Sequence, residues 1–292
     1  MPEPAHVTFI HGLANKPAPD SLRRIWLEAL AEPLAGDGGF DLGAVGVTAS
    51  FVYWADLFND EPIPMSEYES RNDQLAESVP EAPELAEDEW IRTMLEKFPD
   101  EFDDAEVDDE VEGFERIPLP WALKKRLMRH FVREAHAYLF NEDGIRDTIR
   151  QRVLDDFAQV PEGVKHVLVG HSQGSFIAYD VLTGDPECKE IEGLLTLGSP
   201  LGVDEVQDKL VWTRDNGFPE KILTDWVNVY DPLDVVARAD PKLANDFRRN
   251  GEPVVNDVME ENWGRWRHSA TKYFKGPQLR SHLRRLCGRE GA

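Results

Sequence analysis

The stretch Val167-Leu168-Val169-Gly170-His171-Ser172-Gln173-Gly174-Ser175-Phe176-Ile177-Ala178 decides the fold of this 292-residue chain. It reads as a short buried strand, an abrupt turn with the pattern G-x-S-x-G, and the start of an apolar helix. Glycine suits positions 170 and 174 because a Cβ at either would crowd the strand or helix that the turn brings together. We expect the turn to push the Ser172 hydroxyl out above the sheet edge, unshielded, as a nucleophile. The alternative is an ordinary glycine-bounded turn.

Strand-like and helix-like segments alternate outward from this turn. We expect short β-rich runs at 6–10, 45–54, 164–169, 193–197 and 226–230. Helical patterns are expected at about 20–30, 121–140, 143–157 and 270–286. This alternation predicts a single α/β domain over 1–292, with a mostly parallel central sheet flanked by helices on both faces.

The formal net charge of −24 is concentrated in one segment. Residues 56–115 hold 23 of the 56 acidic residues and only 3 of the 32 basic ones, so the rest of the chain is close to balanced. Charge repulsion, several prolines and missing periodicity predict that much of this segment is loop or disorder. The strongly negative charge and scattered basic residues disfavour nucleic-acid binding.

The sequence argues against several other classes of protein. No apolar run reaches the roughly 18 residues of a membrane span, and the start of the chain lacks the basic region of a secretory signal. Cys188 and Cys287 form neither a disulfide framework nor a metal-ligand spacing, so we expect a cytoplasmic location. The acidic run 103–109 resembles a calcium loop in composition only. No phosphate- or dinucleotide-binding motif is present, so we expect no metal and no cofactor.

A nucleophilic serine needs a histidine base and a carboxylate that orients it. His268 and His282 follow both the serine and the next strand end that carries a carboxylate, and we favour His268, in a loop before the last helix. His282 lies in a basic helix and is better explained as a surface residue. For the acid, Asp234 and Asp231 both follow the 226–230 strand. Asp231 directly precedes a proline, which suits a turn-capping role.

Together these residues resemble the α/β-hydrolase superfamily, particularly its lipase-like and esterase-like members. The resemblance covers roughly 5–55 and 160–285, and the family's order of serine, acid and histidine is reproduced by Ser172, Asp234 and His268. It favours Asp234 over Asp231 as the acid. It also implies an oxyanion hole made by the backbone N–H groups of Leu13 and Gln173. The chain has His11-Gly12-Leu13 where a glycine-rich form is common.

The resemblance implies a serine hydrolase that cleaves a carboxylic ester through an acyl-enzyme. The same three side chains would also serve an amidase or peptidase, a thioesterase or an acyltransferase, and a binding or signalling protein can keep the fold without turnover. An inserted acidic and helical cap is expected at 56–142. The expected apolar mouth for a hydrophobic acyl substrate is lined by His11, Gly12, Trp121, Leu123, Leu127, Phe131, Trp263 and Trp266. The alternative is that these side chains simply pack in the core.

Overall fold

The computed structural model describes residues 2–34, 36–68, 85, 88–97, 121–210, 218–264 and 266–291, with the backbone alone for 121–127. Most of the acidic segment that is predicted to be loop or disorder lies outside these residues. The described residues between the second and third strands along the chain lie mainly in helices.

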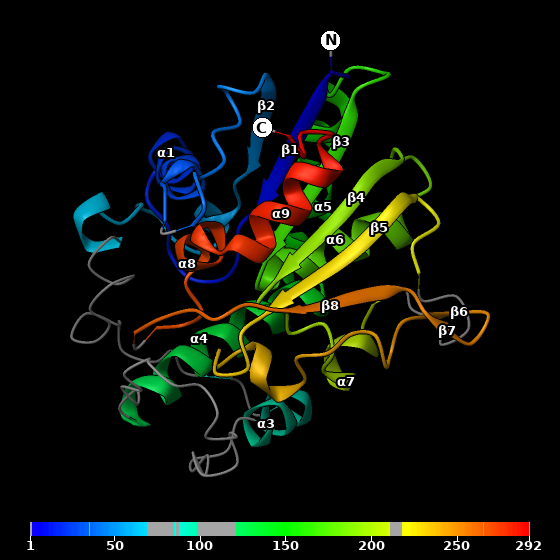
Figure 1. Cartoon of the computed structure of the whole chain (residues 1–292). Helices are drawn as coiled ribbons and strands as arrows, with labels where there is room; N and C mark the ends of the chain where they lie inside the picture. The colour runs from blue at the N-terminus through cyan, green and yellow to red at the C-terminus, as the bar shows by residue number, and fades with distance from the viewer. Residues whose placement is uncertain are drawn as a thin grey trace.

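The centre of the molecule is a six-stranded sheet in which every pair of neighbouring strands is parallel (Figure 1). The strand order is β2-β1-β3-β4-β5-β8, and the strands are β1 (Ala5–Ile10), β2 (Val47–Val52), β3 (Lys165–His171), β4 (Ile191–Leu197), β5 (Ile222–Tyr230) and β8 (Val255–Met259). The predicted parallel sheet is confirmed. The edge strand β8 was not predicted, and neither was the small antiparallel hairpin of β6 (Arg248–Arg249) and β7 (Glu252–Pro253).

Helices cover both faces of the sheet, as predicted. One face carries α1 (Pro19–Ala31), α8 (Ala270–Lys275) and α9 (Pro277–Leu286); Figure 1 shows α9 in front of the strands, with α5 and α6 behind them. The other face carries α3 (Glu89–Glu96), α4 (Trp121–Leu139), α5 (Ile145–Gln159) and α6 (Gln173–Gly184). The shorter elements are α7 (Asp204–Gln207), η1 (Ala55–Leu57), η3 (Glu142–Gly144) and η4 (Ala237–Ala239).

The single helix predicted at 270–286 is wrong, because the chain forms two helices there. Gly276 has an extended backbone, with φ −65° and ψ 132°, between the end of α8 and Pro277 at the start of α9. A residue before proline is pushed away from the helical region, and proline itself favours the first position of a new helix. The Gly276-Pro277 pair therefore breaks the helix.

The strands alternate between two hydrophobic clusters. In β3, Val167 and Val169 belong to the cluster under α1, α8 and α9, whereas Leu168 belongs to the cluster under α4, α5 and α6. Successive side chains of a strand point to opposite faces, so a strand that is apolar at every position must be covered on both sides. Strand β3, which leads to Ser172, is thus fixed at the centre of the domain.

Helix α4 comes from the expected insertion at 56–142, and its described side chains, from Met128 onward, include several that are buried in the core. Phe131, Val132 and Tyr138 have no exposed surface, and the Tyr138 ring lies 5.5 Å from the ring of Phe176 in α6. Phe131, expected at the mouth of the site, is therefore a core residue. The role of the insertion as a cap stays a prediction.

No helix in the described ranges combines the length and the apolar character needed to cross a bilayer.

Candidate active site

The turn after β3 holds its serine in a strained backbone conformation. Ser172 has φ 55° and ψ −126°, in the region of positive φ that residues with a side chain rarely occupy. Its N–H donates to the carbonyl of Leu197 at 2.8 Å, and α6 begins at the next residue. Backbone strain of this kind costs roughly 1–3 kcal/mol and is found at functional sites.

Three glycines allow the chain to close around this turn. A Cβ on Gly170 would lie 2.6 Å from the carbonyl oxygen of Gly174, and a Cβ on Gly174 would collide with the carbonyl of Ile10. A Cβ on Gly12 would lie 2.5 Å from the Cβ of Ser172. The predicted need for glycine at 170 and 174 is confirmed, and Gly12 brings the loop after β1 against the serine.

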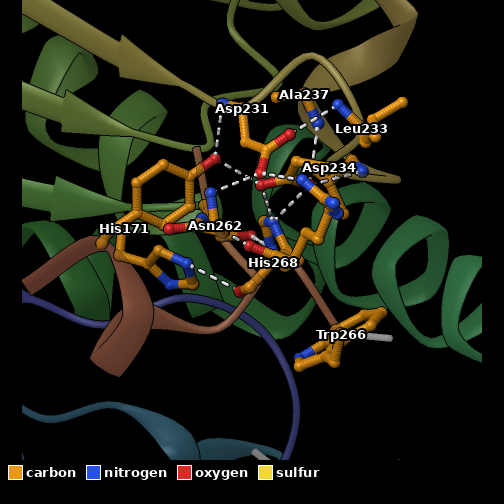
Figure 2. Close-up of polar contacts among 12 residues, drawn as sticks. His171, Asp231, Leu233, Asp234, Ala237, Asn262, Trp266 and His268 are labelled. Carbon is orange, nitrogen blue, oxygen red and sulfur yellow. Dashed lines mark hydrogen bonds and ion pairs between the residues drawn. The ribbon is translucent and has the colours of Figure 1, made fainter. Parts of the chain in front are cut away.

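A continuous line of hydrogen bonds joins Ser172, His268 and Asp234. The Oγ of Ser172 lies 2.8 Å from Nε2 of His268, and Nδ1 of His268 lies 2.8 Å from both carboxylate oxygens of Asp234 (Figure 2). Because a carboxylate only accepts hydrogen bonds, Nδ1 carries the proton and Nε2 is left to accept one from the serine. The structure thus brings together the three side chains that the sequence singles out.

The parallel sheet explains how these distant residues meet. Ser172 follows the carboxyl end of β3, Asp234 follows that of β5, and His268 lies in the loop between β8 and α8. The carboxyl ends of parallel strands share one edge of the sheet, which is where sites form in open α/β folds.

Asp231, the alternative acid, is engaged elsewhere. Its Oδ1 accepts from the N–H of Leu233 at 2.7 Å, and its Oδ2 accepts from the N–H of Asn262 at 2.8 Å and from Arg267 at 3.1 Å (Figure 2). Burial raises the pKa of Asp231 to about 6, although Arg267 opposes the shift. Asp231 therefore ties together the loops after β5 and β8, and only Asp234 contacts His268.

The expectation that the Ser172 hydroxyl is unshielded is wrong. Ser172 and Asp234 have no exposed surface, and His268 is 3% exposed. The loop that contains Gly12 packs against the serine on one side, and His268 contacts its Oγ on the other. In such surroundings the hydrogen bonds between the three side chains are stronger than they would be in water.

The two backbone N–H groups that the resemblance implies for an oxyanion hole, those of Leu13 and Gln173, make no other hydrogen bond in the described part of the chain. The Gly12–Leu13 peptide is oriented by His11, whose Nδ1 donates to the carbonyl of Gly12 at 2.7 Å. In a trans peptide the N–H points away from the carbonyl, so this bond aims the N–H of Leu13 to the opposite side.

His11 and His171 support the site from within the fold. Nε2 of His11 accepts from the N–H of Trp54 at 2.9 Å, and its ring stacks on Trp54 at 4.6 Å. Nε2 of His171 donates to the carbonyl of His268 at 3.0 Å. Burial lowers the pKa of both His11 and His171 well below the usual range, so both stay neutral.

The tryptophans expected around the site differ in their surroundings. The ring of Trp266 lies 5.6 Å from that of His268, edge to face, and is half-buried (Figure 2). Trp263 is half-buried over the ammonium group of Lys272, 5.8 Å from its ring centre. The side chains of Trp121, Leu123 and Leu127 lie outside the described residues.

Two further residues, Gly198 and Tyr273, support Asp234. Gly198 has φ 53°, and a Cβ there would lie 2.6 Å from Oδ2 of Asp234. Tyr273 donates to the same oxygen at 2.7 Å from helix α8. No short motif surrounds Tyr273, and its partner lies in another loop.

In the described part of the chain, no three His, Cys, Asp or Glu side chains are grouped in a way that suits a metal ion.

Comparison with known proteins gives distant structural similarities. No family model matches the sequence, and no curated protein sequence matches it. The fold is similar to acyl-protein thioesterase 2 of Zea mays, at 13% identity and a TM-score of 0.44 over 99% of this chain and 96% of that one. It is also similar to a dienelactone hydrolase of Anabaena variabilis, at 11% identity and a TM-score of 0.41 over 98% and 85%, and to an S-formylglutathione hydrolase of Agrobacterium tumefaciens, at 12% identity and a TM-score of 0.40 over 99% and 86%.

The strand order, the helices on both faces and the strained serine turn at the carboxyl end of β3 define the class of protein. The chain has the α/β-hydrolase fold.

Proposed function

We propose that this protein is a serine hydrolase that cleaves carboxylic esters, with Ser172 as nucleophile, His268 as base and Asp234 as the orienting acid. The observation that carries the proposal is the line of hydrogen bonds from Ser172 Oγ through His268 to Asp234. A serine hydroxyl is a poor nucleophile near neutral pH until a base takes its proton. Here the base lies within hydrogen-bond reach and its tautomer is fixed by the carboxylate.

In the first half of the reaction, Ser172 Oγ attacks the carbonyl carbon of the ester while His268 Nε2 takes the hydroxyl proton. The carbonyl oxygen becomes an oxyanion, which accepts hydrogen bonds from the N–H groups of Leu13 and Gln173. Each such donor contributes about 3–4 kcal/mol to transition-state stabilisation. The intermediate collapses as His268 gives its proton to the leaving alcohol, and the acyl group stays on the serine.

In the second half, water attacks the acyl-enzyme. His268 Nε2 takes a proton from the water, the carboxylic acid leaves, and the proton returns to Ser172 Oγ. Asp234 stabilises the imidazolium in both halves by accepting the hydrogen bond from Nδ1. The buried surroundings of the three residues strengthen these charge interactions.

The substrate we propose is neutral and carries a hydrophobic acyl group. The half-buried ring of Trp266 beside His268 supports an apolar contact near the reacting atoms. The net charge of −24 disfavours an anionic substrate surface.

A fluorophosphonate probe tests the proposal, because it reacts covalently with activated serines. We expect labelling of the native protein at Ser172 and none of Ser172→Ala. Ser50→Ala is the matched control: Ser50 Oγ lies 2.8 Å from both His6 Nε2 and Asp156 Oδ1. In that cluster Nδ1 of His6 contacts the Thr48 hydroxyl, and the aspartate contacts the serine. No carboxylate therefore orients this histidine as a base, and labelling should persist in Ser50→Ala.

A series of p-nitrophenyl esters of increasing chain length then tests the substrate. Turnover that rises with acyl length supports the hydrophobic acyl group. Labelling at Ser172 without turnover of any ester shifts the proposal to amide, thioester or acyl-transfer chemistry on the same residues. Failure of the native protein to label leaves a hydrolase fold that binds without turnover, and the enzyme proposal is then wrong.

A further inference from the structure

Glu134 is a buried carboxyl group that reaches from helix α4 to the loop after β1. It is 5% exposed, and its Oε2 accepts from the N–H of Ala14 at 2.8 Å. Ala14 has φ 67°, a conformation that the loop must be held in. Ala14 directly follows Leu13, whose N–H is assigned to the oxyanion hole.

Both polar groups of the Leu13–Ala14 peptide, the carbonyl of Leu13 and the N–H of Ala14, are hydrogen-bonded to side chains. Glu134 accepts from the N–H of Ala14, and the ammonium group of Lys16 donates to the carbonyl of Leu13. The ammonium group also donates to the carbonyl of Ala14 at 3.1 Å. The preceding peptide is held by His11. With both flanking peptides fixed, the direction of the Leu13 N–H is set before any substrate arrives.

The same residue of α4 also contacts the other half of the oxyanion hole. The side-chain amide of Gln173 donates to the backbone carbonyl of Glu134 at 3.3 Å. Glu134 is therefore bonded to the neighbour of Leu13 through its carboxyl group and to Gln173 through its main chain. Leu13, through its neighbour Ala14, and Gln173 are therefore both positioned by contacts with one residue of α4.

The role of Glu134 in these contacts is to accept a hydrogen bond, whatever its charge. Burial raises the pKa of its carboxyl group to about 7, against the opposing effects of the Ala14 N–H, Lys16 and Arg133. A protonated carboxyl keeps one oxygen that accepts, and so does the amide of glutamine. Glutamine at this position should therefore preserve the geometry, whereas alanine should lose it.

We propose that Glu134 is a positioning residue that holds the Leu13 half of the oxyanion hole in its reactive geometry. The proposal rests on the proposed function of Ser172 and deepens it by adding a residue of α4 to the support of the site. An oxyanion donor acts on charge that develops only in the transition state, so its displacement lowers kcat and leaves KM nearly unchanged.

The test compares Glu134→Ala, Glu134→Gln and Lys16→Met in two measurements: ester kinetics, and amide hydrogen exchange of the peptide that contains residues 11–17. Glu142→Ala is the control, because Glu142 is bonded to His136 of the same helix and lies outside the contacts just described. We expect Glu134→Ala and Lys16→Met to lower kcat by about 10- to 100-fold, with KM within about threefold. Exchange in the peptide should quicken in both. Glu134→Gln and Glu142→Ala should stay near the native protein in both measurements.

Unchanged exchange of this peptide in Glu134→Ala overturns the proposal. Equal losses of kcat in Glu134→Gln and Glu134→Ala overturn it as well, since the amide retains the acceptor. If Glu134→Ala does not fold, the kinetic test uses Lys16→Met. A rise in the KM of that variant with an unchanged kcat contradicts the proposal. If the native protein does not react with fluorophosphonate, the proposed function is wrong. The hydrogen-exchange measurement still decides, independently, whether Glu134 holds the loop.

Discussion

The hydroxyl of Tyr273 donates to Oδ2 of Asp234 at 2.7 Å. The same hydroxyl accepts from the N–H of Asp231 at 3.0 Å. Burial, with both aspartates nearby, raises the pKa of Tyr273 well above its usual range, so the hydroxyl keeps its proton. Oδ1 of Asp234 is held in turn by the N–H of Val236 at 2.8 Å. The carboxylate that faces His268 is therefore fixed through both of its oxygens.

Replacing Tyr273 with phenylalanine should weaken both the fold and the reaction. The N–H of Asp231 loses its acceptor in a buried place, which should lower the free energy of unfolding by about 1–3 kcal/mol. Asp234 loses one of its fixed contacts, so kcat should fall while KM holds. Denaturant titration and ester kinetics measure the two effects. Tyr230→Phe, at the end of β5, touches neither bond and serves as the control; equal behaviour of the two variants would contradict this role of Tyr273.

The two neighbouring aspartates should respond differently to the same change. In Asp234→Asn, the amide cannot hold Nδ1–H of His268 as a carboxylate does, and we expect kcat to fall by about 10⁴ with an unchanged circular dichroism spectrum. Asp231→Asn should keep most of its turnover and lose stability, because Asp231 bonds two loops. The reverse pattern would transfer the orienting role to Asp231.

Asp231 should also leave a signature in the pH dependence of stability. Its pKa is about 6 in the folded protein, above the unfolded value of roughly 3.9. The folded state therefore binds its proton more tightly, and the stabilisation from that proton is present below about pH 4 and lost as the pH rises through 6. The destabilisation caused by Asp231→Asn should be larger at pH 4.5 than at pH 7.5. Thermal unfolding at the two pH values measures it, and a difference of opposite sign would refute the assignment.

Gly12 should tolerate no side chain. In Gly12→Ala, the added Cβ would lie 2.5 Å from the Cβ of Ser172 and 2.9 Å from the carbonyl of His171, so either the loop or the serine must move. We expect loss of fluorophosphonate labelling by at least about 100-fold, as a displacement near 1 Å causes. Gly38→Ala is the matched control, since a Cβ there meets nothing within 4 Å. Labelling of Gly12→Ala at the native rate would show that the loop does not press on the serine.

Local patterns predicted the parts of the fold whose cause is local. The β3 strand is apolar at positions facing both sides, and a Cβ on Gly170 or on Gly174 would collide with the backbone. Edge strand β8 escaped prediction because Asn256 and Asp257 interrupt it. The Asp257 carboxylate is satisfied by Asn228 and by the N–H of Leu243, both distant in sequence.

In the candidate site, too, some residues were predictable from local patterns and others were not. Ser172, Asp234 and His268 follow a recognisable order along the chain, and the structure brings their side chains together. Glu134 sits in an amphipathic helical pattern, where a glutamate is usually solvated; its partner Ala14 is 120 residues away. The Tyr273 hydroxyl likewise acquires its hydrogen bonds only when α8 packs against the loop after β5. Contacts between residues that are far apart in the sequence produce no local pattern from which they could be predicted.

The strand order has a consequence for how the chain comes to be folded. β1 lies between β2 and β3, with Ala5 paired to Val47 on one side and to Lys165 on the other. As the chain emerges from the ribosome, β1 and β2 are complete long before β3 exists, so one edge of β1 stays unpaired until β3 has been made. Non-local parallel pairing of this kind is slow and leaves strand edges open to aggregation. Synthesis of this protein should therefore depend on protection of the unpaired edge of β1 until β3 is made. Chaperone capture of chains truncated before residue 165 should exceed that of chains released after β3.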